Sequence, residues 1–153
     1  MAVFSIDRAA FTPSLTLNNW SLRSPSATPN GFRALAIGWG GRGTASTPYR
    51  TRWAITVDVN GVSGTSLTVV KHSPGSSSPN TNTDLRSAAD TFPSEPAGIF
   101  AVDWDVHGGH GELFFPDNGC PIVVASSVTR NLSCINTAGT DANLSNYWVM
   151  WEE

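Results

Sequence analysis

The feature that most constrains the fold is an alternation of apolar and polar side chains with a period of two residues. From Tyr49 to Val59, every second position carries a large or β-branched side chain, whereas Arg50 and Arg52 stand at positions between them. A second alternation runs from Phe100 to Val106. Because successive side chains of a β-strand point to opposite faces of the sheet, each run predicts a strand with one buried face.

Weaker versions of the same pattern predict further strands, bounded by clusters of Gly, Pro, Asn and Ser. These strands are expected at Leu15 to Leu22, Phe32 to Trp39, Thr65 to Lys71, Gly111 to Phe115, Pro121 to Ala125, Val128 to Ile135 and Asn146 to Trp151. Short strands at this spacing predict an all-β fold, an antiparallel β-sandwich of the jelly-roll or Greek-key type. No linker divides the chain, which predicts a single domain over residues 1–153.

One long connection, the loop over residues 73–98, interrupts this series of strands and contains several prolines. Residues 83–90 inside it are the only stretch of helical composition, enough for about two helical turns. Loops of this length in compact domains are often functional. We therefore expect this crossover loop to touch a partner.

A hairpin is expected after the first strong strand, because Asn60-Gly61 favours a turn. A loop over residues 60–64 would place Val57 opposite Leu67 and keep the apolar faces of both strands in register. The segment from Thr65 to Lys71 is thus predicted to pair with the strand that begins at Tyr49.

The two cysteines allow two interpretations. If residues 126–128 form a hairpin loop, Cys120 and Cys134 lie opposite each other and a cross-strand disulfide is feasible. The alternative, two buried thiols, is favoured for a chain made in a reducing cytosol.

The charge content argues against several classes of protein. Charged residues make up 14 % of the chain, where soluble domains carry about 25 %. Lys71 is the one lysine and the arginines are scattered, unlike the clustered basic residues of a nucleic-acid-binding protein. No apolar run reaches the ~20 residues of a membrane helix, and the start lacks a basic leader and an apolar signal segment. We expect a protein made in the cytoplasm that binds neither nucleic acid nor membrane.

The densest group of potential metal ligands runs from Asp103 to Glu112 and includes Asp105, His107 and His110. Two imidazoles and a carboxylate could hold zinc or iron, and such a hairpin resembles the cupin metal site. The spacing departs from the cupin pattern, because two residues separate the histidines and Glu112 follows His110 after one. We expect a solvated hairpin tip here.

Other catalytic patterns are incomplete. The glycine-rich segment 38–43 lacks the Gly-Lys-Ser/Thr of a phosphate-binding loop, and neither Gly-x-Ser-x-Gly nor Ser-x-x-Lys occurs. A carboxylate pair for glycoside hydrolysis would have to come from few glutamates, two of which stand at the end of the sequence. We expect no enzyme activity, no cofactor and no bound metal.

Several apolar residues are expected to contact a partner. The tryptophans could form a sugar-stacking platform, although the alternation places most of them in the core. Trp148 and Trp151 have opposite parity on the last strand, so at least one should face away from the core, where a partner would cover it. Residues 1–13 form an apolar arm that should dock under its own domain or onto a neighbouring chain. The expected contact residues are Phe4, Ile6, Phe11, Arg42, Trp148 and Trp151.

Three segments give the chain a resemblance to a known class of protein. They are the opening residues 1–17, the run Phe-Arg-Ala-Leu-Ala-Ile-Gly-Trp-Gly-Gly at 32–41, and the run Thr-Pro-Tyr-Arg-Thr-Arg-Trp at 47–53. With these segments, the whole chain resembles capsid decoration (cement) proteins of tailed bacteriophages.

The resemblance implies a structural virion protein that is made in the host cytoplasm and located on the capsid surface. Its partners would be the major capsid protein and copies of itself, as a dimer or trimer. Such a protein stabilises the assembled shell because it binds the assembled form alone.

Two other functions remain open. A lectin-like or tail-associated receptor-binding domain would stack sugar on an exposed tryptophan with Asn, Asp and Arg nearby. A cupin-like metalloenzyme would depend on His110 and would contain stoichiometric metal.

Overall fold

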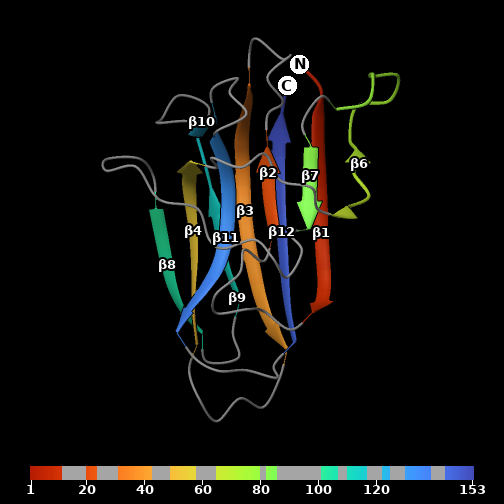
Figure 1. The fold of residues 1–153 in the computed structure, drawn as a ribbon. Helices are drawn as coiled ribbons and strands as arrows, with labels where there is room; N and C mark the ends of the chain where they lie inside the picture. The colour runs from red at the N-terminus through yellow and green to blue at the C-terminus, as the bar shows by residue number, and fades with distance from the viewer. Residues whose placement is uncertain are drawn as a thin grey trace.

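The computed structural model describes residues 1–11, 20–23, 31–42, 49–57, 65–79, 82–85, 101–106, 110–116, 122–124, 130–138 and 144–153. The regular elements in these ranges are all β-strands (Figure 1). They are β1 (Val3–Phe11), β2 (Trp20–Arg23), β3 (Phe32–Arg42), β4 (Tyr49–Val57), β5 (Thr65–Ser66), β6 (Val70–Lys71), β7 (Asn82–Leu85), β8 (Ala101–Val106), β9 (His110–Phe114), β10 (Ile122–Val124), β11 (Arg130–Ala138) and β12 (Leu144–Glu152). Among the described residues, no helix has the length and apolar character needed to cross a membrane.

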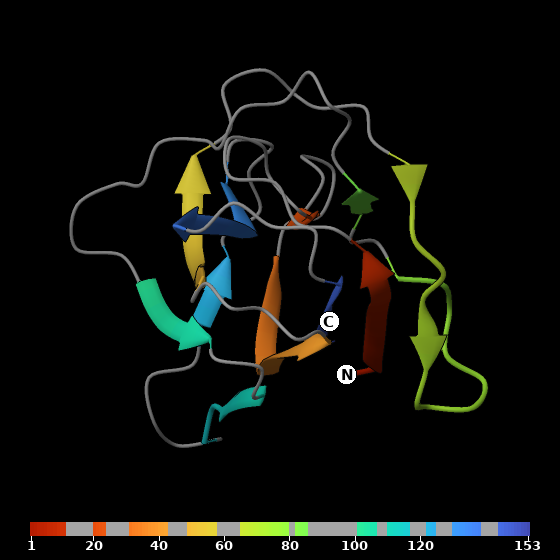
Figure 2. The ribbon, with the colours of Figure 1, turned by 90° about the horizontal axis from the view of Figure 1, so that it is seen from below.

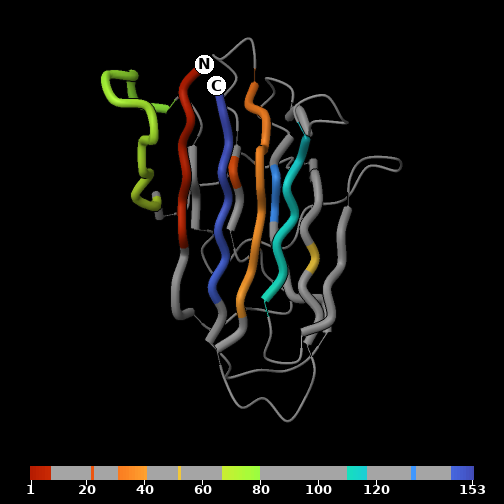
Figure 3. Tube along the Cα trace, turned by 180° about the vertical axis from the view of Figure 1, so that it is seen from behind, coloured from red at the N-terminus to blue at the C-terminus, as the bar shows by residue number. Residues whose placement is uncertain are grey.

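The strands form two sheets, and every pairing between described strands is antiparallel. In the first sheet the order is β10-β3-β12-β1-β6, and β9 also pairs with β3. In the second sheet the order is β5-β7-β2-β11-β4-β8. Figure 3 shows β6, β1, β12, β3 and β9 side by side in the first sheet. The predicted all-β, antiparallel character of the chain is therefore confirmed for the described residues.

The strands with the clearest alternation lie where the sequence predicts them. β4 covers most of the run from Tyr49 to Val59, and β8 covers the run that ends at Val106. The two strands pair with each other, with Trp53 opposite Val102. The weaker patterns also coincide with strands where the structure describes them, although the segment from Thr65 to Lys71 is divided between β5 and β6, which belong to different sheets. The segments that begin at Leu15, Pro121 and Val128 fall partly outside the described residues.

The predicted pairing of the segment from Thr65 to Lys71 with the strand from Tyr49 is wrong, and so is the hairpin over residues 126–128 that the disulfide alternative required. β5 pairs with β7 and β6 pairs with β1, whereas β4 lies between β11 and β8. β10 and β11 belong to different sheets, and Cys134 of β11 lies opposite Trp53 of β4. Cys120 is outside the described residues, so the pairing that would have brought the two cysteines together is absent from the described strands. The turn residues indicated where the chain reverses but not which strand it meets next.

The prediction of a helix at residues 83–90 is also wrong for the first residues of this range. Residues Asn82–Leu85 form strand β7, which pairs with β2 and β5 in the second sheet. Cross-strand partners on both sides override the local composition here, as is common for short polar segments. The crossover loop 73–98 is therefore not a single loop, and its residues 86–98 lie outside the described residues.

The opening of the chain is a strand rather than an arm. β1 lies between β12 and β6, with Phe4 opposite Trp151 and Phe11 opposite Ser145. Ala2 and Glu153 exchange two backbone hydrogen bonds of 3.0 and 3.1 Å, so the two termini lie side by side (Figures 1 and 2). Of the two docking modes expected for residues 1–13, the described residues 1–11 have the one within the same chain.

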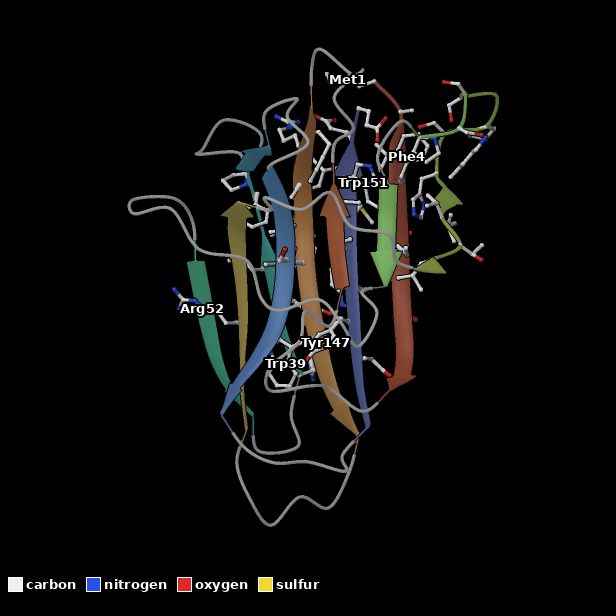
Figure 4. All side chains as sticks on the ribbon, in the orientation of Figure 1. Met1, Phe4, Trp39, Arg52, Tyr147 and Trp151 are labelled. Carbon is white, nitrogen blue, oxygen red and sulfur yellow. The ribbon has the colours of Figure 1, made fainter. Side chains whose placement is uncertain are left out.

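The core gathers aromatic and aliphatic side chains from both sheets. Phe4 and Trp151 stack with ring centroids 5.7 Å apart (Figure 4), and both are buried. Leu22 and Leu132 of the second sheet belong to the same cluster as these residues of the first sheet. Burying a side chain of this size contributes roughly 1.5–3 kcal/mol.

Candidate binding site on the first sheet

The exposed face of the first sheet is organised around Trp148. Along β12, Tyr147, Val149 and Trp151 are buried, whereas Trp148 and Met150 are half-buried. The alternation therefore turns Trp151 into the core and Trp148 to the opposite face. This confirms that the two tryptophans of the last strand differ in orientation, as their parity predicts.

A glycine makes room for the indole ring of Trp148. Gly38 of β3 lies opposite Trp148, and a Cβ atom built on Gly38 would stand 2.2 Å from Nε1 of that indole. No real side chain can occupy that position, so the ring lies directly against the backbone of β3. Glycine inside a strand often marks such a close approach.

Four neighbouring strands place one row of residues across this face. Asp7 of β1 lies opposite Trp148, Trp148 lies opposite Gly38, and Gly38 lies opposite Glu112 of β9. Directly opposed residues of an antiparallel ladder share one face of the sheet. With about 4.8 Å between strands, the row spans about 14 Å between the Cα atoms of its two acidic ends.

A parallel row on each side completes the face. On one side, Asn146 lies opposite Gly40, which lies opposite His110. On the other side, Met150 lies opposite both Ser5 and Ala36, and these continue to Val70 and Phe114. Small residues thus occupy the β3 position in every row, and larger side chains surround them.

These rows enclose a hollow of about 500 Å³. Its lining includes the apolar side chains of Trp148 and Met150 and the polar side chains of Asp7, His110, Glu112 and Asn146. The size falls within the ~300–1,000 Å³ of pockets that bind small molecules. The hollow therefore combines an aromatic surface with several hydrogen-bonding groups.

Two of the polar side chains of the lining are carboxylates, which accept hydrogen bonds and carry negative charge. Asp7 and Glu112 are exposed carboxylates on opposite sides of Trp148. The Ser5 hydroxyl is 2.7 Å from Nε2 of His72, which holds that hydroxyl at the β6 side. Among the described lining residues there is neither lysine nor arginine, so their formal charge is negative.

Apolar side chains extend the face beyond the hollow. Phe114 is 66 % exposed, and its ring centroid is 6.3 Å from that of Trp148 at an interplanar angle of 53°. Val70, which is part of the lining, is 53 % exposed on the β6 side. Exposed aromatic groups beside a hollow are typical of surfaces that bind a ligand or another protein.

The structure separates the six residues expected to contact a partner. Phe4, Ile6 and Trp151 are at most 2 % exposed, which corrects the prediction that they face a partner, because their own chain already covers them. Phe11 and Arg42 lie at the ends of β1 and β3, opposite Ser145 and Leu144. Trp148 and Ile6 are the two of the six that line the hollow, and only Trp148 of these is more than 2 % exposed.

The potential metal ligands of the sequence do not form one hairpin. Asp103 and Asp105 are in β8 of the second sheet, whereas His110 and Glu112 are in β9 of the first sheet. His107 is outside the described residues. In the described part of the chain, no three His, Cys, Asp or Glu residues gather into a group that could hold a metal ion.

Sequence reasoning missed most of the hollow. Gly38 and Gly40 interrupt an apolar strand, which indicates a close approach of another group. Their partners, Trp148 for Gly38 and Asn146 for Gly40, are more than one hundred residues away, and only the strand order identifies them. Asp7 and Glu112 become neighbours of Trp148 for the same reason.

No protein family model matches the chain, and no curated protein or solved structure gives a match either.

Proposed function

We propose that this chain is a non-catalytic, lectin-like carbohydrate-binding protein and that sugar stacks on Trp148 in the hollow of the first sheet. The observation that carries this proposal is a half-buried indole on a glycine floor, with carboxylates in the same row on both sides. Phe4, Ile6 and Trp151 belong to the core, so they are not available to bind a capsid shell. The exposed face around Trp148 therefore favours ligand binding.

The chemistry of a sugar ring suits this arrangement. One face of a pyranose presents C–H groups, which pack on an aromatic surface, and its edge presents hydroxyls. Hydroxyl donors form stronger hydrogen bonds with ionised carboxylates than with neutral acceptors. Asp7, Glu112 and Asn146 stand around Trp148 where such an edge would lie.

We also propose that the two sheets pack face to face as a β-sandwich of the jelly-roll or Greek-key type. Leu22 and Leu132 of the second sheet share a buried cluster with Phe4, Ile37 and Trp151 of the first. A single core with contributions from two sheets is typical of a sandwich.

The carbohydrate proposal is tested by binding of the purified protein to maltotriose, lactose and chitotriose, measured by calorimetry and on a glycan array. Trp148→Ala should weaken binding by at least about ten-fold, as removal of a central aromatic contact does in other interfaces. Trp148→Phe should retain part of the affinity, and Lys71→Ala, outside the hollow, should retain all of it. Equal binding by wild type and Trp148→Ala would disprove the proposal.

A second candidate function is supported by Phe114 and Val70, which are large apolar side chains with more than half of their surface exposed. We propose it as a structural role in a phage virion, in which the chain binds the major capsid protein and its own copies on the capsid surface. Quantitative mass spectrometry of purified particles tests it. Hundreds of copies per particle would support a decoration protein, and a few copies would support a tail-associated receptor-binding protein.

A further inference from the structure

We infer that the hollow selects uncharged sugars and amino sugars and rejects acidic ones. This inference rests on the proposed function and adds the class of carbohydrate that the site accepts. It follows from the distribution of charge around Trp148 rather than from the indole itself.

The two carboxylates flank the platform from both sides. Asp7 is in β1 and Glu112 is in β9, and the strand order places β12 and β3 between them. Both side chains are exposed, and each contributes a formal negative charge. A sugar ring that lies on Trp148 therefore has Asp7 on one side and Glu112 on the other, in either orientation of the ring.

Lys71 and Arg33, two cations whose side chains the structure describes, lie away from this row. Lys71 pairs with Phe4, whose side chain is in the core, so it belongs to the face of the sheet opposite the hollow. Its Nζ atom is 3.3 Å from the carbonyl oxygen of Ser76. Arg33 forms an ion pair with Glu152 at the end of the sheet. Neither cation is part of the lining.

A carboxylate or sulfate on the bound ring would therefore meet like charge, with no lysine or arginine among the described lining residues to offset it. Like-charge contacts of this kind are a common means of excluding the wrong ligand. An ammonium group on the ring would instead gain an ion pair with Asp7 or Glu112. Neutral hydroxyls would donate hydrogen bonds to the same oxygen atoms.

The test compares sugars that differ in one charged group. Methyl glucoside, methyl glucosaminide and methyl glucuronide, and the matching galacto series, are titrated into the protein by NMR at low salt. We expect the uronide to bind about ten-fold more weakly than the neutral glycoside. The amino sugar should bind at least as tightly as the neutral glycoside. At about 0.5 M NaCl these differences should shrink, because salt screens exposed charges.

The matched variant is Asp7→Asn combined with Glu112→Gln, which keeps the shape of the hollow and removes both charges. In this variant the uronide should bind within about two-fold of the neutral sugar. Both residues are exposed, so the change should leave the stability within about 0.5 kcal/mol of wild type.

Four outcomes would overturn the inference. Equal binding of uronide and neutral sugar by wild type would show that the carboxylates do not select, while the carbohydrate site itself would stand. If the double variant still bound the uronide weakly, the selection would come from the shape of the hollow and not from its charge. Tight uronide binding that disappears in Arg42→Ala would place an anion site at the end of β3. Absence of binding to every sugar would instead overturn the proposed function together with the inference.

Discussion

Gly38 decides whether the aromatic surface of the site can exist. Its missing side chain is the space that the indole of Trp148 occupies, because a Cβ atom would come within 2.2 to 2.7 Å of three ring atoms. A Cβ atom built on Gly40, two residues later, would stand 3.9 Å from its nearest neighbour, the Cβ of His110. The two glycines therefore have different roles although they share a strand and a face.

Gly38→Ala should displace the Trp148 ring while the sheet remains intact, since the ring is half-buried and can move toward solvent. Two-dimensional NMR should show a large shift of the Trp148 indole N–H signal, assigned with the Trp148→Phe variant, and sugar binding should fall by about ten-fold. Gly40→Ala is the matched control, because its added methyl group makes only ordinary contact. A Trp148 signal unchanged by Gly38→Ala would mean that the ring does not lie against Gly38.

At the scale of the element, β1 carries both the core and the site. Phe4 and Ile6 point into the core, and Ser5 and Asp7 belong to the face of the hollow. The strand has neighbours on both sides, β12 and β6, and the Ser73 hydroxyl accepts a hydrogen bond of 3.2 Å from the Val3 amide. Removing it would expose Trp151 and break the row through Trp148.

Deletion of residues 1–11 should therefore abolish folding rather than release a soluble, folded remainder. Phe4→Ala should lower the free energy of unfolding by about 3–5 kcal/mol through loss of packing on Trp151, whereas Ser5→Ala should change it by less than about 1 kcal/mol. Urea denaturation monitored by circular dichroism measures both. A cooperative transition in the truncated chain would restore the interpretation of residues 1–13 as a detachable arm.

The strands themselves could be predicted from the sequence far better than their neighbours. Alternation is a local property, and it places β4 and β8 within a few residues. Pairing depends on which apolar faces meet across the core, and no local signal identifies β11 as the partner of β4. For this reason the hairpins were wrong, and the site, which requires four strands in the correct order, could be predicted only at Trp148.

At the scale of the whole molecule, the two sheets share one buried cluster. Leu132 of β11 is fully buried in the same core as Val149 and Trp151 of β12. If this core holds the sheets together, they should unfold as one cooperative unit, as single domains of this size usually do.

Leu132→Ala tests this cooperativity, with an expected loss of about 2–5 kcal/mol from the cavity that it creates. Hydrogen exchange of the slowest amides should then accelerate by a similar factor in β11 and in β12, because both would exchange through global unfolding. Faster exchange in β11 alone would show that the sheets are separate units. Ser5→Ala, on the far face of the first sheet, should leave both strands unchanged.

The paired termini also determine how the molecule responds to mechanical load. Ala2 and Glu153 are hydrogen-bonded to each other at the same end of β1 and β12, so a force that pulls the two ends apart acts across the ladder between these strands. The hydrogen bonds between β1 and β12 would then break one pair after another, starting at the termini. They would not bear the force together, as they do when two strands are pulled along their length. A molecule tethered by both termini would yield at low force, whereas one held through a single terminus would keep its sheets and its hollow intact.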